Sequence, residues 1–595
     1  MGSPRKRATR RTAARSGGRS GAPDTTGPFS IRFTLVAMAI GAGFLVVVLK
    51  LVQLQIIDSA KLSARAESQH LKSVRLAGER GTITDRNGAI LAKNMDVPSI
   101  SANPSAIKNP KATARALSRL LPVSARTLEK RFSANGRHFT WVHRKTDPAL
   151  AGRIMDLGLT GVHQLPESRR FYPKGKLLGH ILGFAGIDNQ GLSGVERVFD
   201  SRLKGGEIHF VVERDALGNQ GSPTNAVYER PDSGADITLT IDEVIQYHVE
   251  KQLDLAMART EAKSASVVVM APDSGEILAM AVRPEFDPNR PGSYVASDFR
   301  NRILTDPYEP GSTMKVLIAA TALEQGVVTL DEVIDCENGY LSLRGGPLRD
   351  SHPHDMLTFH EVLAKSSNIG TYKVADRIGP QGIYDALRKF GLGQRTGIEL
   401  GGESTGVLLP VSRWSGRSLA SISIGQELSV TPLQLATAAS AVANGGWLIK
   451  PHIVREIRDD HEVDRTRPIR VRRVISDATS RTLLDALVAV TEKGGTAVKA
   501  AIPGYRVAGK TGTAQKAAVG KRGYAKGKYV SSFLGMVPAE DPKLVILVVI
   551  DEPKGRYYGG TVAAPVFRDV ARPVLQYMGV HPETDRKVVL SKHAL

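Results

Sequence analysis

Three short polar patterns follow one another along this chain of 595 residues: Ser312-Thr-Met-Lys315, Ser366-Ser-Asn368 and Lys510-Thr-Gly-Thr513. A serine hydroxyl is a weak nucleophile at neutral pH, and a lysine can take its proton only if the pKa of the amine is lowered. Lys315 lies three residues after Ser312, which on a helix places both side chains on one face. The spacing therefore predicts a serine acyl-transfer site whose base is a lysine and not a histidine.

The residues around the first pattern predict where the serine lies. Pro310 and Gly311 precede Ser312, and the segment after it is rich in helix formers up to Gln325 and stops at Gly326. This order predicts that the serine begins a helix. Free backbone N–H groups and the helix dipole would stabilise an alkoxide and an oxyanion there.

The other two patterns offer a proton relay and a cation. Ser366 supplies a hydroxyl and Asn368 an amide, directly after a predicted helix over 359–365. The segment 505–509 with the third pattern at its end is predicted to be a strand, and the glycines of this strand would let a substrate backbone lie alongside it. A cation at Lys510 and burial would together keep the nearby lysine amine neutral.

Each pattern alone is common, but the ordered set is the motif set of the penicillin-binding proteins and related beta-lactamases. The flanking segments 301–312, 364–370 and 557–567 resemble the division-specific class B penicillin-binding proteins, the septal peptidoglycan transpeptidases. The resemblance also reaches upstream, and it covers nearly everything after the N-terminal tail. The upstream segments are 80–92, 170–173 and 191–196.

The resemblance implies a serine-type D,D-transpeptidase that crosslinks peptidoglycan stem peptides through an acyl-enzyme on Ser312 and that beta-lactams acylate at the same serine. Lys315 would be the base, Ser366 would pass the proton to the departing D-alanine, and Asn368 would hold the donor peptide. Beside Lys510, the residues Thr511, Gly512 and Thr513 would bind the terminal carboxylate. The backbone N–H groups of Ser312 and Thr513 would form the oxyanion hole. No metal and no organic cofactor is required.

Three other functions share these patterns. A beta-lactamase must activate a deacylating water, and the sequence shows no further carboxylate motif that can be assigned to that task. A catalytically silent division scaffold would keep every interaction with its partners and lose only turnover. Within the family, an elongation-specific class B transpeptidase is the nearest alternative.

The N-terminus predicts a membrane anchor. Residues 1–32 carry eight Arg or Lys against Asp24 alone, and their composition predicts a disordered tail. The apolar segment 33–57 is long enough to span a membrane, and the basic residues before it predict that the tail is cytoplasmic. A net charge of +21 and a pI near 9.9 are also typical of nucleic-acid binding, but the apolar segment argues against that function. A cleaved signal peptide, with a weak cleavage site at 63–66, is the alternative.

The anchor also carries small residues along one flank, at Ala37, Gly41, Ala39 and Gly43, where another membrane helix could pack closely. The resemblance implies a membrane-embedded glycan polymerase of the SEDS family and other division proteins as partners. It places the protein in the cytoplasmic membrane at the septum.

The sequence predicts a multidomain α/β protein. Its parts are the tail 1–32, a transmembrane helix over 33–57, a mixed α+β pedestal over 58–232, a transpeptidase domain over 233–582 and a C-terminal tail over 583–595. In the pedestal, Asn87-Gly88 predicts a hairpin. The resemblance implies a penicilloyl-serine transferase fold, an antiparallel five-stranded sheet covered by helices. Its predicted strands are 266–270, 277–282, 505–510, 531–537 and 544–550.

Three further features suggest weaker hypotheses. Cys336 is the only cysteine, which excludes an internal disulfide and favours a structural role. His352 and His354, with Asp350 and His360 nearby, have the donor types of a zinc site, although a loop with surface histidines fits them better. The loop over 516–528 is basic without acids, and it could steer anionic cell-wall strands or simply be a solvated hairpin tip.

Overall fold

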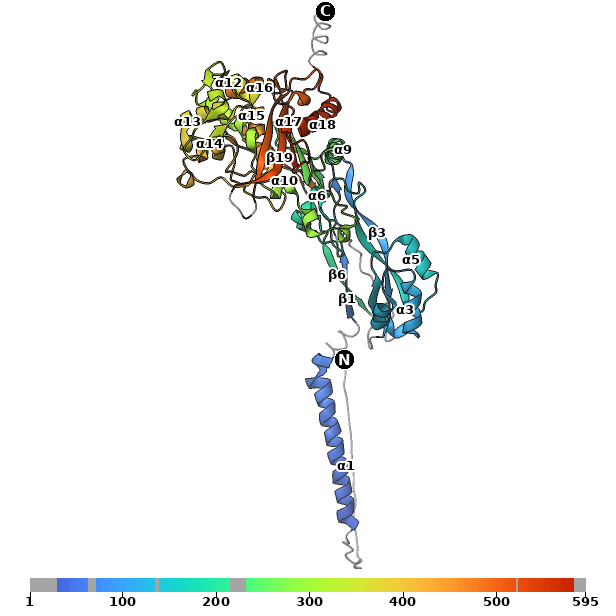
Figure 1. The fold of residues 1–595 in the computed structure, drawn as a ribbon. Coiled ribbons are helices and arrows are strands. Elements are labelled where there is room, and N and C mark those ends of the chain that lie inside the picture. The colour runs from blue at the N-terminus through green and yellow to red at the C-terminus, as the bar shows by residue number, and fades with distance from the viewer. Residues whose placement is uncertain are drawn as a thin grey trace, which may run out of the picture. The chain divides into compact units, whose positions relative to one another are not determined.

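The structure is a computed structural model that describes residues 29–62, 71–133, 138–213, 232–518, 520 and 523–582. The chain forms two compact units (Figure 1). The first comprises Met1–Leu76 and Ile208–Glu229, and the second Ala77–Glu207 and Arg230–Leu595. Most of the predicted N-terminal tail, the weak cleavage site at 63–66 and the predicted C-terminal tail lie outside the described residues.

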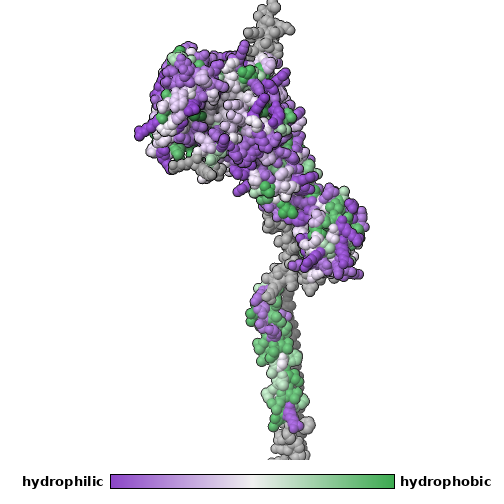
Figure 2. Space-filling model, viewed as in Figure 1, coloured by the Kyte–Doolittle hydropathy of each residue, from purple (hydrophilic) through white to green (hydrophobic). Residues whose placement is uncertain are grey.

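The first unit contains the predicted membrane anchor. Helix α1 (Phe29–Val52) continues into a π-helical turn η1 (Gln53–Ile57), and Ile31–Ile57 forms one long, mostly apolar segment. Its side chains are exposed and predominantly apolar (Figure 2). A helix of this length and composition can cross a hydrocarbon layer. A two-stranded sheet of β1 (Leu71–Ala77) and β6 (Glu207–Glu213) follows.

In the second unit, the pedestal strands β2 to β5 belong to a mixed sheet of parallel and antiparallel strands. Its order is β16-β15-β7-β2-β3-β4, and β5 also pairs with β3. The predicted turn at Asn87-Gly88 joins β2 to β3, and Gly88 has a φ of 88°. The strand bounds are β2 (Ile83–Thr84), β3 (Ile90–Ala102), β4 (Thr140–His143), β5 (Val162–Phe171), β7 (Asp236–Leu239), β15 (Val454–Arg458) and β16 (Val463–Arg465).

Three short helices pack on the β3–β5 part of this sheet around a small core of their own. They begin in the same way, because a polar side chain caps the first turn: Asn109 for α3 (Pro110–Ser118), Ser124 for α4 (Ala125–Phe132) and Asp147 for α5 (Pro148–Met155). Apolar residues at helical spacing then face inward, among them Leu117, Leu128 and Ile154.

A buried ionic network fixes the pedestal where the chain passes from α7 (Gly194–Val198) to α8 (Asp200–Leu203). Glu196 is fully buried, and its two carboxylate oxygens accept from Arg80 Nε at 2.7 Å and from Arg170 Nε at 2.6 Å. Arg80 also pairs with Asp200 at 2.6 Å, and Arg170 donates to the Gly81 carbonyl at 2.7 Å. A charge can be buried in this way only when it is paired and hydrogen-bonded.

The predicted five-stranded antiparallel sheet is confirmed. Its order is β18-β19-β20-β8-β9. The predicted start of the strand at Tyr505 is wrong, because Tyr505 closes a turn on Ile502 and the strand begins at Ala508. The strand then runs through the third motif to Ala517. The bounds are β8 (Ser264–Met270), β9 (Ile277–Arg283), β18 (Ala508–Ala517), β19 (Tyr524–Val537) and β20 (Leu544–Asp551).

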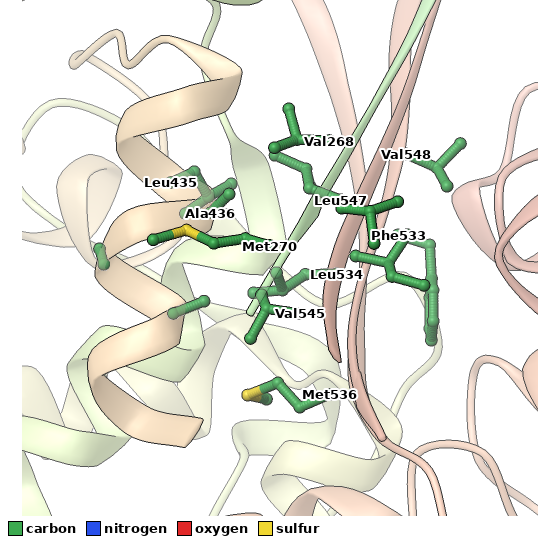
Figure 3. Close-up of a cluster of buried hydrophobic side chains, with 14 of the residues drawn as sticks. Val268, Met270, Leu435, Ala436, Phe533, Leu534, Met536, Val545, Leu547 and Val548 are labelled. Carbon is green, nitrogen blue, oxygen red and sulfur yellow. The ribbon is translucent and has the colours of Figure 1, made fainter. Parts of the chain in front are cut away.

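Helices cover both faces of this sheet, so its central strands are continuous apolar runs. On one face lie α9 (Glu243–Thr260) and α18 (Ala564–Tyr577), and on the other α15 (Pro432–Ala443). Figure 3 shows Leu435 and Ala436 of α15 against Met270, with Phe533 and Val548 on the far side of the strands. Behind α15 pack α11 (Lys315–Glu324) and α16 (Asp477–Val488). This layer holds the nucleophile against the sheet.

Candidate active site

Ser312 lies in a 3-10 turn, η5 (Gly311–Met314), that leads directly into α11. The predicted helix is confirmed, and it ends before Gly326, whose φ is 66°. Gly311 has a φ of 57° and donates its N–H to the Gly425 carbonyl at 3.0 Å, so a glycine suits this entry to the turn. The serine is half-buried, whereas Lys315 is fully buried.

Gly512 brings the third motif against the nucleophile turn. A Cβ atom at this position would lie 2.8 Å from the Pro310 carbonyl oxygen and would also collide with Ser532 Oγ. The backbone of β18 can therefore approach the residues before Ser312 only if position 512 has no side chain. The sequence predicts that the glycines of this strand let a substrate backbone lie alongside it, and the structure shows that Gly512 also makes room for the enzyme's own chain.

The second motif forms a tight turn between two helices. The predicted helix α12 (Phe359–Lys365) is confirmed, and Ser366 caps its end with a φ of 63°. Ser367 is the N-cap of α13 (Asn368–Lys389). Positive φ is costly for a residue with a side chain, so the contacts around the turn must hold it.

The side chains of all three motifs meet at Ser366. Lys315 Nζ donates to the Ser366 carbonyl oxygen at 2.7 Å and to Asn368 Oδ1 at 2.7 Å, and it lies 3.3 Å from Ser366 Oγ. Lys510 Nζ donates to the same hydroxyl at 2.8 Å. Four of the predicted residues, Ser366, Asn368 and both lysines, thus share one hydrogen-bonded cluster at the base of the Ser312 turn.

Burial makes both lysines poor cations. Removal from water lowers the pKa of Lys315 to about 7, although the Asp350 carboxylate acts in the opposite direction. Burial also lowers the pKa of Lys510 well below its ordinary value, and the neighbouring Lys315 lowers it further. Because the two amines are coupled, they titrate as a pair.

The two threonines of the third motif already have partners in the protein. Thr511 Oγ1 lies 3.0 Å from Thr496 Oγ1, and Thr513 Oγ1 accepts from the Gly559 N–H at 3.0 Å. Strand β18 is an edge of its sheet, so its outer side can bind an extended peptide through the backbone. A substrate that binds at 511–513 would therefore share the two hydroxyls with their partners in the protein.

Other residues near the site carry no catalytic signal in the sequence. Tyr529 and Tyr557 stack with ring centroids 4.0 Å apart, and Tyr558 stacks on Tyr557 at 4.7 Å. Tyr529 lies opposite Gln515 of β18, so these rings flank the open strand. An open cavity of about 430 Å³ lies where β18 leaves the site, lined in part by Glu309. In the sequence, the only indication that these tyrosines and Glu309 lie near the site is that they are close to the segments flanking the motifs.

The zinc hypothesis finds no support: in the ranges that the structure describes, no group of three or more His, Cys, Asp or Glu is placed to hold a metal. Asp350 has another role, because Oδ2 accepts from Ser367 Oγ at 2.6 Å and Oδ1 accepts from the backbone of the second motif. Cys336 is buried below the same turn, where the Ser367 hydroxyl lies 3.4 Å from its sulfur.

Two lysines of the predicted basic segment 516–528 are paired with acids from another part of the chain. Lys516 Nζ pairs with Asp551 at 2.7 Å and with Glu552 at 2.8 Å, and Lys528 pairs with Glu552 at 3.1 Å. The acids come from the end of β20, far away in sequence. Residues 519, 521 and 522 lie outside the described residues.

Comparison with known proteins agrees with this geometry. Residues 265–572 match the penicillin binding protein transpeptidase domain, and residues 75–239 match the penicillin-binding protein dimerisation domain. Stage V sporulation protein D of Bacillus subtilis is 38% identical over 554 residues, which cover 91% of this chain and 85% of the relative. Peptidoglycan D,D-transpeptidase FtsI of Escherichia coli is 34% identical over 561 residues, 93% of each chain. Among solved structures, penicillin binding protein 3 of Mycobacterium tuberculosis in complex with aztreonam aligns with a TM-score of 0.68 and 29% identity, covering 86% of this chain and 98% of that chain.

The chain belongs to the class B penicillin-binding proteins, in which a dimerisation domain precedes a transpeptidase domain. It is a penicillin-binding peptidoglycan D,D-transpeptidase, and the one long apolar helix among its described residues fits a single-pass membrane anchor.

Proposed function

We propose that the protein crosslinks peptidoglycan stem peptides at the division septum through an acyl-enzyme on Ser312. The observation that carries the proposal is a cluster in which Lys315 and Lys510 both donate to Ser366 and Lys315 also donates to Asn368. Lys315 lies one helical turn after Ser312, the serine at the start of a buried helix. Such a cluster supplies a base, a relay and a second amine to one nucleophile.

In the first half-reaction, the neutral Lys315 amine takes the Ser312 proton as the serine oxygen attacks the carbonyl of the penultimate D-alanine. Backbone N–H groups of Ser312 and Thr513 bind the developing oxyanion, and each such donor is typically worth about 10²- to 10³-fold in rate. The proton then passes through Ser366 to the amine of the departing D-alanine. The C–N bond breaks, and the donor peptide remains as an ester on Ser312.

In the second half-reaction, the amine of another stem peptide attacks the ester carbonyl. Its proton returns through the lysine to the Ser312 oxygen, which leaves as the hydroxyl, and the new amide is the crosslink. Throughout, Asn368 holds the donor backbone. Lys510 with Thr511, Gly512 and Thr513 receives the terminal carboxylate, which suits the open edge of β18 and its cation.

The division role and its setting extend the proposal. The sequence flanks of the motifs resemble the septal class, and the match to the E. coli FtsI protein spans 93% of the chain. We place the tail 1–32 in the cytoplasm, the helix over 33–57 in the cytoplasmic membrane, and the pedestal 58–232 and the transpeptidase domain 233–582 on the outer side. Small residues on α1 would let another membrane helix pack closely. By resemblance to the septal class, that partner is a membrane-embedded SEDS-family glycan polymerase, and the pedestal would contact other division proteins.

A second role has a specific observation in its favour. The relative that is 38% identical over 91% of this chain is a sporulation protein by name, so the same chemistry could serve the cell wall of a spore. Elongation-specific synthesis is a third setting for the same active site.

The test of chemistry is labelling of the full-length protein with a fluorescent penicillin, followed by mass spectrometry of the adduct. Wild type and Ser297→Ala, which removes an exposed serine, should be labelled equally, whereas Ser312→Ala should not be labelled. An adduct on another residue would overturn the assignment. The setting is tested in cells by localisation of a fluorescent fusion: a band at midcell supports division, a lateral pattern supports elongation, and a signal confined to the forespore supports sporulation.

A further inference from the structure

Asp350 lies outside the three motifs, but its carboxylate accepts three hydrogen bonds from residues 367–369, within and directly after the second motif. It follows β12 (Leu348–Arg349), sixteen positions before Ser366. One carboxylate oxygen, Oδ2, accepts from Ser367 Oγ at 2.6 Å. The other, Oδ1, accepts from the N–H of Asn368 and from the N–H of Ile369 at 3.1 Å.

These bonds hold the turn and the start of α13, which carry Ser366 and Asn368. The Asp350 carboxylate caps the first turn of α13, where the helix dipole favours a negative charge. The preceding carbonyl, of Arg349, accepts from Asn368 Nδ2 at 2.7 Å, so two consecutive residues grip Asn368 from outside. The opposite end of that amide, Oδ1, receives Lys315 Nζ. The carboxylate is therefore connected to the catalytic amine through one residue, Asn368.

We propose that Asp350 is a positioning residue of the acylation step, whose carboxylate holds the Ser366–Asn368 turn against Lys315. The inference rests on the roles given above to Lys315 and Ser366. A non-glycine residue at positive φ, as at Ser366, persists only where surrounding contacts over-determine it, and Asp350 supplies three of these contacts. Charge-assisted bonds to backbone N–H groups are roughly twice as strong as neutral ones.

The same carboxylate also acts on Lys315 through its charge. The groups that face this lysine are Lys510 from β18, Asp350 from the β12 loop and the Cys336 thiol below the turn. Burial lowers the pKa of Lys315, and the Asp350 charge limits the decrease. Removal of this charge should lower the pKa further, so the neutral amine would persist to lower pH. A purely structural contact would not have this effect.

The experiment measures the second-order rate of acylation by a fluorescent penicillin, from pH 5 to 9, with the full-length protein in detergent. Asp350→Asn keeps the shape and one acceptor oxygen but loses the charge, and we expect its acid limb to move down by roughly one pH unit. Asp350→Ala removes every contact, and we expect the rate to fall about 10²-fold at all pH values, as for other small displacements of a reacting group. Asp355→Asn, at an exposed position in the same loop, is the matched control and should behave as wild type.

Each result supports or overturns the proposal. An acid limb that moves to lower pH in Asp350→Asn, together with slower acylation in Asp350→Ala, supports it. If the acid limb of the pH profile of Asp350→Asn is not shifted, the proposal is overturned. An unchanged rate would then mean that Asp350 has no role in acylation, and a rate that falls uniformly together with thermal stability would mean that its role is only structural. If Asp350→Ala does not fold, the limb of Asp350→Asn alone decides. Labelling that survives Ser312→Ala would instead overturn the proposed function, so the two failures are distinguishable.

Discussion

The acylation rate should depend on pH through the buried amine of Lys315. The ordinary pKa of a lysine is 10.5, and burial lowers that of Lys315 to about 7. At pH 7 an amine with the ordinary value would be neutral in about 3 molecules of 10⁴, whereas one with a pKa of about 7 is neutral in about half. Burial thus enlarges the fraction of competent base by roughly 10³-fold at neutral pH.

The expected profile follows from the sign of this shift. The base works as the free amine, so the rate should rise with pH, by about tenfold per unit at pH values well below 7, and level off above about pH 8. The assay is the second-order rate of fluorescent-penicillin acylation at a series of pH values, with the thermal midpoint recorded at each one to show that the fold persists.

A matched substitution separates the base from the fold. In Lys315→Arg the side chain keeps its positive charge at all accessible pH values, so the acid limb should vanish and the rate should fall by roughly 10²- to 10⁴-fold, the usual range for loss of a general base. A wild-type profile that is flat from pH 5 to 9, or that rises only near pH 10, would refute the reasoning, because Lys315 would then be either unused or unperturbed.

Three further substitutions test the framework of the site. Gly512→Ala should slow acylation by about 10²-fold, because its Cβ would meet the Pro310 carbonyl at 2.8 Å and push away the nucleophile turn. Glu196→Ala should destabilise the protein by about 3–5 kcal/mol in urea denaturation, because it leaves two buried arginines without their shared carboxylate. Leu547→Ala, in the fully buried centre of β20, should cost about 2–5 kcal/mol in the same assay by opening a cavity.

Controls for these substitutions come from the same chain. Gly292→Ala adds a methyl group where no atom lies within 4 Å, and it should leave acylation unchanged. Arg197→Ala and Leu409→Ala alter exposed positions and should change stability by less than about 1 kcal/mol. Equal effects in a test variant and its control would contradict the packing argument for that position.

The five central strands and the helices next to the motifs could be predicted from the sequence. Runs such as 544–550 are apolar throughout because both faces of the sheet are covered, and their length and flanking turns set them apart from helices. The helix after Ser312 was predicted for a similar reason, since its composition and the glycine behind it are local signals. The order of the strands was not derivable from the residues, because pairing depends on contacts between distant segments.

Long-range contacts also explain what the sequence missed at the site. In the sequence, Asp350 is only an acid close to three histidines, whereas its partners are the hydroxyl and backbone N–H groups of 367–369. The lysines of the basic loop looked unpaired because Asp551 and Glu552 come from another strand. A glycine at position 512 indicates that another group comes close to the strand, and only the structure shows that this group is the Pro310 carbonyl.

The position of Ser366 between the two amines suggests how the substrate itself completes the base. Two ammonium ions cannot share a dry cluster at low cost, so at neutral pH the pair holds few protons. A substrate carboxylate beside Lys510 would raise the pKa of that amine and draw a proton to it. Its positive charge would in turn disfavour protonation of Lys315, whose Nζ lies 3.3 Å from Ser366 Oγ, while Lys510 donates to this same oxygen at 2.8 Å. In the proposed mechanism the carboxylate that the enzyme recognises therefore also keeps its base neutral, so a substrate without this carboxylate would lose reactivity at Ser312 as well as affinity.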